Sequence, residues 1–184
     1  MLKRLVICLL LLVLDSRAVE IIAHRGASYD APENTLASVN LGWQRGADAV
    51  EVDVYLSKDG KIVALHDKNT KRTTGHDGLV HELTWGQLRQ LDAGSWKNKK
   101  YKNEPIPLLS QILETIPKGK YLVIEIKCGP EIIEPLARLL KRTRTAPANT
   151  SIISFSYEVV AAAKKRFPQR RVYYLSAIKL NSKT

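Results

Sequence analysis

Three acidic residues interrupt apolar stretches of the sequence. Glu51 and Asp53 lie two positions apart in residues 49–56, an alternating β-branched run typical of a strand, so both carboxylates point to one face. Glu125 lies in the apolar run 121–127, where an uncompensated buried charge is costly. Three carboxylates without an evident His or Cys ligand set favour Ca²⁺ or Mg²⁺ over zinc. The open alternative is a salt-bridged strand face exposed to solvent.

Two histidines, His24 and His66, each end a short apolar run and are followed directly by a polar residue. A single histidine at a strand end is often a hydrogen-bonded structural residue. A pair with ordinary pKa values near ~6.5 can accept one proton and donate another, which displacement at phosphorus requires. Arg25 and Lys127 would then supply fixed positive charge to phosphoryl oxygens.

The elements that must position these side chains alternate between strand and helix. Strands are predicted at residues 21–24, 49–56, 62–66, 121–127, 151–155 and 172–175. Helices are predicted at residues 35–45, opened by Pro32 and Asn34, and at 84–91, 108–116, 131–142 and 157–167. This alternation indicates a parallel α/β sheet with crossovers. Polar residues after several strands favour a TIM-type (β/α) barrel over a doubly wound sheet, whose first loop is normally glycine-rich.

The composition is that of a globular domain. Of 184 residues, 45% are apolar and 26% are charged, which excludes a disordered or collagen-like chain. The net charge of +11 makes an anionic partner the first consideration. The basic residues are scattered, however, and no recognisable nucleic-acid module surrounds them. We therefore expect mostly solvated surface charges and no nucleic-acid partner.

The first 18 residues form a predicted signal peptide. Lys3 and Arg4 precede an apolar run over residues 5–14, and the small residues Ser16 and Ala18 fit a cleavage site. The run is too short to span a bilayer, which takes ~20 residues. The expectation is an exported protein, periplasmic or extracellular, with no stable membrane span in the mature domain at residues 19–184. A buried helix or an uncleaved anchor is the alternative.

Several short motifs follow one another between residues 21 and 127. They are AHRGA at 23–27, PENT at 32–35, GAD at 46–48, EVDV at 51–54, DG at 59–60, HD at 66–67, RTTG at 72–75, LDAG at 91–94, IPL at 106–108 and EIK at 125–127. Each motif alone is weak. In this order and spacing they resemble the glycerophosphodiester phosphodiesterase family.

This resemblance implies a phosphodiesterase-type (β/α) barrel that cleaves small-molecule glycerophosphodiesters to glycerol 3-phosphate and an alcohol, with Ca²⁺ or Mg²⁺ as cofactor. By matching motif, it assigns the acid/base pair to His24 and His66, the metal ligands to Glu51, Asp53 and Glu125, and the phosphate contacts to Arg25 and Lys127. Glu33 would support these residues as an outer neighbour of the site. The resemblance gives no role to Asp67 and does not decide which histidine is the acid.

Two alternatives to this activity stay open at this point. A complete barrel needs eight strand–helix units and usually ~250 residues, whereas about six strands are predicted, so the barrel is expected to be truncated at its C-terminal end. An inactive phosphate-binding homologue is therefore one alternative. The other is a phospholipase or lysophospholipase D-like phosphodiesterase of the same superfamily. The oligomeric state does not follow from the sequence.

Overall fold

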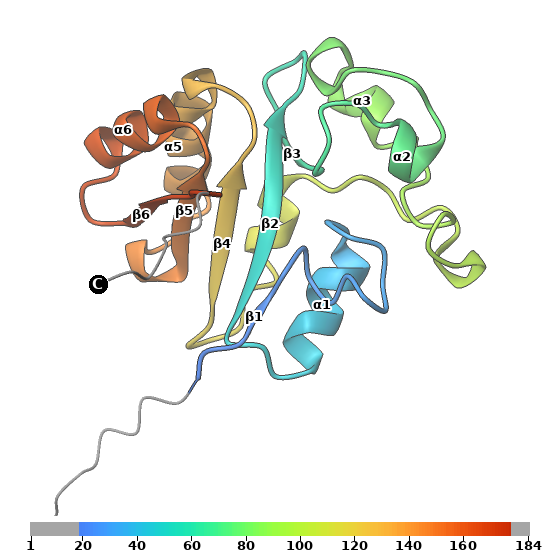
Figure 1. The fold of residues 1–184 in the computed structure, drawn as a ribbon, viewed down its shortest axis with the longest axis horizontal. Coiled ribbons are helices and arrows are strands. Elements are labelled where there is room, and N and C mark those ends of the chain that lie inside the picture. The colour runs from blue at the N-terminus through green and yellow to red at the C-terminus, as the bar shows by residue number, and fades with distance from the viewer. Residues whose placement is uncertain (1–18, 178–184) are drawn as a thin grey trace, which may run out of the picture.

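The computed structural model describes residues 19–177, and its centre is a single sheet. The parallel strands, which pair in chain order, are β1 (Ile22–Ala23), β2 (Ala49–Leu56), β4 (Tyr121–Ile126), β5 (Thr150–Ser154) and β6 (Arg171–Tyr174) (Figure 1). A doubly wound sheet reverses its strand order at a switch point, and no such reversal occurs among the described strands. The order is that of a (β/α) barrel, as predicted.

One predicted strand has the opposite direction. β3 (Ile62–Ala64) pairs antiparallel with β2 and lies off the parallel path. The connection from β2 to β3 is a tight turn in which the Ser57 hydroxyl accepts a 2.9 Å hydrogen bond from the Lys61 amide. So short a connection cannot make the crossover that a parallel pair requires. The described residues therefore contribute five parallel strands, and His66 lies in the loop after β3.

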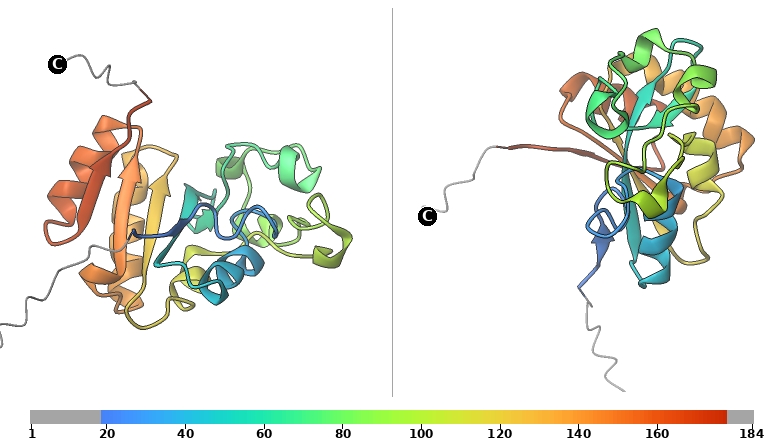
Figure 2. Two further views of the ribbon diagram at one scale, coloured as in Figure 1. Left: turned by 60° about the horizontal axis from the view of Figure 1, so that its bottom comes forward. Right: turned by 90° about the vertical axis from the view of Figure 1, so that its right-hand side faces the viewer.

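The main helices pack against one face of the sheet. They are α1 (Leu36–Gln44), α4 (Leu109–Leu113), α5 (Ile133–Arg142) and α6 (Tyr157–Arg166). Their apolar side chains share one core with alternate strand residues, namely Val50, Val52, Val54, Leu122, Ile124 and Ile126. The further views in Figure 2 show these helices along the sheet. The opposite sheet face is thereby left to the polar residues.

Residues 67–107 form a long connection between β3 and α4. It contains α2 (Lys71–Thr74), α3 (Trp85–Leu88) and the 3₁₀ turns η1 (Val80–Glu82) and η2 (Lys99–Tyr101). Two more 3₁₀ turns, η3 (Pro130–Ile132) and η4 (Pro147–Asn149), lie elsewhere in the chain. The connection has its own small apolar cluster around Val80, Leu88 and Ile106. It is therefore a packed segment that can hold a side chain in place.

Among residues 19–177, no helix has the length and apolar character needed to cross a membrane. The predicted signal peptide at residues 1–18 lies outside the described residues, as do residues 178–184.

Candidate active site

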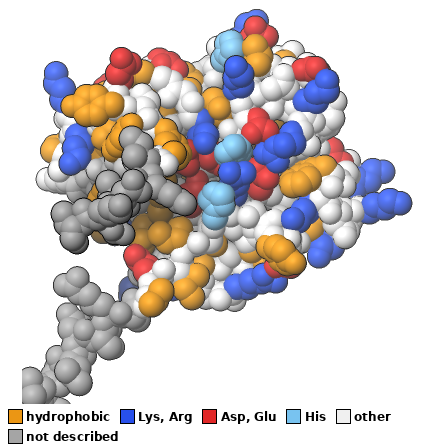
Figure 3. Space-filling model, viewed as in Figure 1, with side chains coloured by type: hydrophobic (Ala, Val, Ile, Leu, Met, Phe, Trp, Pro, Cys, Tyr) orange, Lys and Arg blue, Asp and Glu red, His pale blue; other side chains and the backbone are white. Residues whose placement is uncertain are grey.

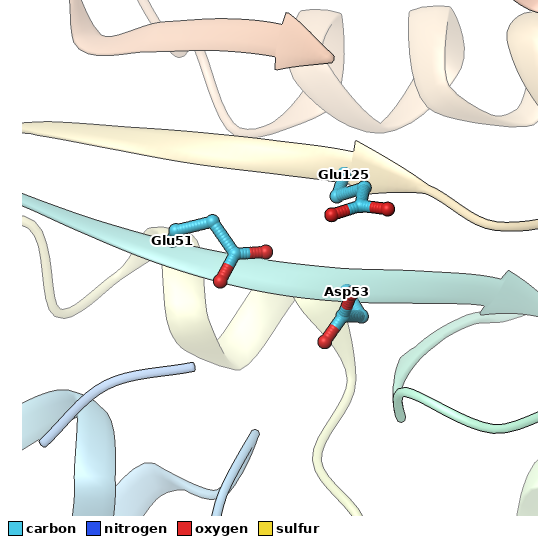
Figure 4. A group of neighbouring side chains, drawn as sticks. All are labelled: Glu51, Asp53 and Glu125. Atoms are coloured by element: carbon cyan, nitrogen blue, oxygen red, sulfur yellow. The ribbon is translucent and has the colours of Figure 1, made fainter. Parts of the chain in front are cut away.

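The sheet brings the three predicted carboxylates together. Register pairs Asp53 of β2 with Glu125 of β4, and Glu51 lies two residues earlier on the same face of β2 (Figure 4). Each carboxylate offers an oxygen, and these three atoms lie within 4.8 Å of one another. The exposed fractions of Glu51, Asp53 and Glu125 are 5%, 0% and 7%. This is a buried cluster, so the alternative of an exposed, salt-bridged strand face does not hold.

The cluster fits a hard divalent cation. Glu51 Oε1 and Asp53 Oδ1 are buried and have no hydrogen-bond partner in the described structure. Burial, followed by the negative charge of Asp53, raises the pKa of Glu51 to about 8. Buried carboxylate oxygens without partners are costly, and a cation bound by oxygen ligands would compensate them. Glu51, Asp53 and Glu125 could therefore hold a metal ion.

Two basic side chains lie against the same cluster. Lys127 Nζ donates a 2.8 Å hydrogen bond to Glu125 Oε1 and lies 3.6 Å from Asp53 Oδ1. Arg25 Nε lies 3.3 Å from Asp53 Oδ2, and Arg25 Nη1 donates to Glu33 at 3.2 Å. Both cations are mostly buried, yet each reaches the edge of the cluster. They place positive charge beside any ligand bound there.

The loop after β1 adopts an unusual backbone conformation at the site. Arg25 and Asn34 have φ values of 56° and 57°, in the left-handed region that few residues other than glycine adopt. Gly26 follows with φ 75°, and a Cβ there would lie 2.5 Å from the backbone of Ser38. This tight approach to α1 directs the Arg25 amide to donate a 2.8 Å hydrogen bond to Glu51 Oε2. Backbone conformations of this kind often mark functional sites.

Asn34 is a site residue that the sequence analysis assigned only to the start of a helix. Its Nδ2 donates to Asp53 Oδ2 at 2.9 Å, and its Oδ1 accepts a 3.0 Å hydrogen bond from the Asp53 amide. Thr35 is the N-cap of α1, accepting from the Ser38 amide. Because Thr35 caps α1, Asn34 is not needed as the N-cap. That could have identified Asn34 as a site residue.

Both histidines lie beside the cluster. His24 Nε2 is 3.9 Å from Glu51 Oε2, and His66 Nε2 is 3.4 Å from Lys127 Nζ. Figure 3 shows histidine, acidic and basic side chains gathered in one region of this face. Burial and the neighbouring Arg25 charge lower the pKa of His24. This shift favours the neutral form of the His24 imidazole.

Asp67, which has no assigned role in the sequence analysis, contacts His66. Its Oδ1 lies 2.6 Å from His66 Nδ1, and its Oδ2 accepts a 2.5 Å hydrogen bond from Arg72 Nε. Arg72, which the sequence analysis also left unassigned, donates two further hydrogen bonds to Glu33. Although burial opposes it, the pKa of Glu33 is lowered by its bonds to Arg72 and Arg25. Glu33 thus contacts Arg25 and Arg72 and holds Arg25 from the side away from the carboxylate cluster.

A groove of about 330 Å³ runs from Glu125 and Lys127 past Ser154, Phe155 and Ser156. It joins the cluster to the loop after β5, so a ligand larger than the cation has space beside the carboxylates. A larger hollow of about 410 Å³ lies near the helices, around Trp85 and Arg138, and contains none of the site residues. We assign the candidate site to the groove because Glu125 and Lys127 line it.

Strand order and the polar residues near the carboxyl ends of the strands define the class, a (β/α)-barrel protein with an acidic cluster that could hold a metal ion. Residues 24–177 match the model of the Glycerophosphoryl diester phosphodiesterase family. The chain belongs to this family.

Individual relatives agree with the family match. The Bacillus subtilis protein YhdW is 40% identical over 151 residues, covering 80% of this chain and 62% of that protein. A glycerophosphodiester phosphodiesterase of Caldanaerobacter subterraneus is 38% identical over 157 residues, covering 83% of this chain and 64% of its own. The chain thus spans a little over three-fifths of the length of these two curated relatives.

Solved structures share the fold. A phosphodiesterase of Oleispira antarctica, in complex with the product sn-glycerol-3-phosphate, has a TM-score of 0.81 and 40% identity. The match covers 89% of this chain and 68% of that chain. A glycerophosphodiester phosphodiesterase of Agrobacterium tumefaciens has a TM-score of 0.77 and 33% identity, covering 84% of this chain and 66% of that chain.

Proposed function

We propose that the protein hydrolyses glycerophosphodiesters to glycerol 3-phosphate and an alcohol, using Ca²⁺ or Mg²⁺. The observation that carries this proposal is the buried cluster of Glu51, Asp53 and Glu125, with two carboxylate oxygens that have no hydrogen-bond partner among the described residues. Two histidines and two basic side chains surround it. The product bound to the Oleispira antarctica phosphodiesterase supports the choice of substrate class.

Glu51, Asp53 and Glu125 would hold the cation. A bound divalent cation supplies positive charge to phosphoryl oxygens and lowers the pKa of a hydroxyl group that contacts it. Asn34 keeps Asp53 in place by its two hydrogen bonds, and the Arg25 amide does the same for Glu51. These bonds fix the ligand oxygens before substrate arrives.

The phosphodiester would lie between the basic side chains and the histidines. Arg25 and Lys127 bind its phosphoryl oxygens and stabilise the negative charge that grows there during displacement. One histidine removes the proton of the glycerol 2-hydroxyl, and the other protonates the departing alcohol. A cyclic phosphate forms and water then opens it. The lowered pKa of His24 keeps that imidazole able to accept a proton at pH 7.

The decisive experiment measures release of glycerol 3-phosphate from glycerophosphocholine by the full 184-residue chain, with Ca²⁺, with Mg²⁺ and with chelator. We expect release with at least one cation and none with chelator. His24→Ala serves as the inactive control. Release that is indifferent to chelator would contradict the cation centre, and no release with either cation would contradict the activity.

The same assay separates the alternative activities. Lysophosphatidylcholine replaces glycerophosphocholine in a parallel reaction, and faster release of choline from the lysolipid would favour the phospholipase alternative. Binding of glycerol 3-phosphate without turnover would favour an inactive phosphate-binding homologue. The proposal predicts faster turnover of the water-soluble diester.

Export of the protein rests on the sequence of residues 1–18 alone. We propose that a signal peptidase removes these residues after Ala18. Expression in a bacterial host, followed by N-terminal sequencing of the periplasmic or secreted protein, tests this. A mature chain that begins at Val19 supports export, and an intact N-terminus in the cytoplasm argues against it.

A further inference from the structure

We propose that Arg72 is a positioning residue that holds His66 through Asp67 and Arg25 through Glu33. The inference rests on the proposed function, in which His66 exchanges a proton and Arg25 binds phosphate. Arg72 belongs to α2, in the long connection after β3, whereas Arg25 and Glu33 belong to the loop after β1. Its guanidinium joins these two parts of the site through Glu33 and Asp67.

Three hydrogen bonds from one guanidinium make the connection. Arg72 Nε donates to Asp67 Oδ2 at 2.5 Å. Arg72 Nη1 and Nη2 donate to the two oxygens of Glu33 at 3.0 and 2.7 Å. The planar guanidinium presents its donors in a fixed fork, so binding one carboxylate also orients the donors toward the other. These bonds raise the pKa of Arg72, and its charge is therefore permanent.

The carboxylates of Asp67 and Glu33 in turn contact His66 and Arg25. Asp67 uses its second oxygen, Oδ1, at 2.6 Å from His66 Nδ1. Glu33 Oε1 accepts a 3.2 Å hydrogen bond from Arg25 Nη1. The result is an unbroken chain from His66 through Asp67, Arg72 and Glu33 to Arg25.

The contact with Asp67 also selects the reactive nitrogen of His66. A carboxylate at Nδ1 favours the tautomer in which Nδ1 carries the hydrogen, leaving Nε2 to accept or donate the mobile proton. His66 Nε2 faces Lys127, which itself donates to Glu125 of the carboxylate cluster. Without Arg72, the Asp67 side chain would keep its contact with His66 but lose the fixed partner that holds its other oxygen. The orientation of the imidazole would then be less well defined.

The backbone at Arg72 is fixed as well as its guanidinium group. Thr73, the next residue of α2, is 4% exposed, and Thr70 donates through its hydroxyl to the His76 carbonyl at 2.5 Å. Gly75 ends the helix with φ 74°, a conformation suited to glycine. An anchored backbone and an engaged guanidinium together favour positioning over a mobile substrate contact.

The experiment compares Arg72→Gln, Arg72→Lys and the control Lys71→Gln in the full chain. Lys71 is the neighbouring cation, and its ion pair with Asp77 lies outside the chain of contacts from His66 to Arg25. With glycerophosphocholine and the activating cation, we expect Arg72→Gln to lower kcat about 10- to 100-fold, the usual effect of losing an outer partner. KM should rise by less than kcat falls, because Arg25 keeps its ion pairs with Glu33 and Asp53. Arg72→Lys should recover only part of kcat because an ammonium lacks the fork.

A second arm tests whether Arg72 acts through Asp67. In the Asp67→Asn background, Arg72→Gln should lower kcat much less than it does in the unchanged chain, because their shared path is already lost. ¹⁵N NMR of the His66 ring should show a clear Nδ1–H tautomer in the unchanged chain and a mixture in Arg72→Gln. Fully additive losses with an unchanged His66 spectrum would overturn the proposal, as would a rise in KM at constant kcat.

The NMR arm also separates this proposal from the proposed function. If the unchanged chain releases no glycerol 3-phosphate, the activity fails, but the His66 tautomer still reports whether Arg72 positions the imidazole. If Arg72→Gln does not fold, Arg72→Lys keeps the charge and supplies the comparison. An unchanged His66 spectrum in folded Arg72→Lys, with undiminished kcat, would then count against the proposal.

Discussion

The two faces of β2 are both buried but have opposite chemistry. Val50, Val52 and Val54 point toward the helices and are fully buried in the apolar core. Glu51 and Asp53 point to the other face and are almost as inaccessible. The neighbouring strand β4 repeats the contrast, since its apolar side chains at positions 122, 124 and 126 belong to the core and its carboxylate at 125 belongs to the cluster.

This contrast separates stability from function within single strands. The helix face stabilises the protein by removing apolar surface from water, at roughly 25 cal/mol per Å². The inner face confines carboxylates, including buried oxygens without partners, and so it costs stability when no cation is bound. Because side chains alternate along a strand, the two roles occupy adjacent residues and can be changed one at a time.

The largest expected effect comes from the histidines beside the inner face. His24→Ala or His66→Ala should lower kcat for glycerophosphocholine by about 10²–10⁴-fold, the usual contribution of a general acid or base. Thermal unfolding should be nearly unchanged, because neither imidazole belongs to the apolar core. Isothermal titration with Ca²⁺ provides the control, since the carboxylates are intact. Normal turnover by either variant would refute the acid/base pair.

A substitution on the helix face should have the reverse effect. Ile124→Ala removes a fully buried side chain of the core and should lower the free energy of unfolding by about 2–5 kcal/mol. The matched variant is Glu125→Gln, at the next residue but on the inner face. Urea unfolding and kcat/KM of the folded fraction are measured for both. A loss of stability for Ile124→Ala and a loss of activity for Glu125→Gln would sharpen the comparison, and equal loss of activity in both would break it.

The alternation of apolar and polar residues along the strands made much of this contrast predictable from the sequence. The predicted strand over residues 49–56 has the same bounds as β2, because every second residue there is apolar and β-branched. The place of β3 was less accessible, since the count of about six barrel strands included residues 62–66, whereas the short connection pairs β3 antiparallel with β2. The helices predicted at 84–91 and 108–116 are shorter in the structure, Trp85–Leu88 and Leu109–Leu113, because turns and caps outweigh periodicity in short segments.

The site was predictable where its residues lie on strands or directly after them. The convergence of Glu51 and Glu125 follows from strand pairing, which the sequence pattern indicates. Arg72 was not identifiable, because its role depends on Glu33, 39 residues away, and on the path of the connection after β3. Asn34 was missed because its sequence position also suits a helix start.

Removing one charge from the inner face should stabilise the metal-free protein. In Glu51→Gln the side-chain oxygen can still accept from the Arg25 amide, and the folded chain no longer holds a carboxyl group whose pKa is raised by burial and by Asp53. We expect a gain on the order of 1–3 kcal/mol, similar to the cost of an unsatisfied buried group. Differential scanning calorimetry with chelator measures this gain. Adding Ca²⁺ should raise the Tm of the unchanged chain but not that of the variant, and a lower Tm for the metal-free variant would contradict the cost assigned to this face.

The same cost should also depend on pH. Glu51 has a pKa of about 8 in the folded protein, above its ordinary value of 4.5. Between these values the unfolded chain has released this proton and the folded chain has retained it, so stability falls as pH rises from about 5 to about 8. The Tm of the metal-free chain should therefore decline over this range by more than that of Glu51→Gln, which lacks the titrating group. Saturating Ca²⁺ should reduce the decline, because binding to the ionised carboxylate compensates its charge. Equal pH profiles for the two metal-free chains would show that Glu51 is ionised without penalty, and the contrast between the two faces of β2 would then not be one of stability.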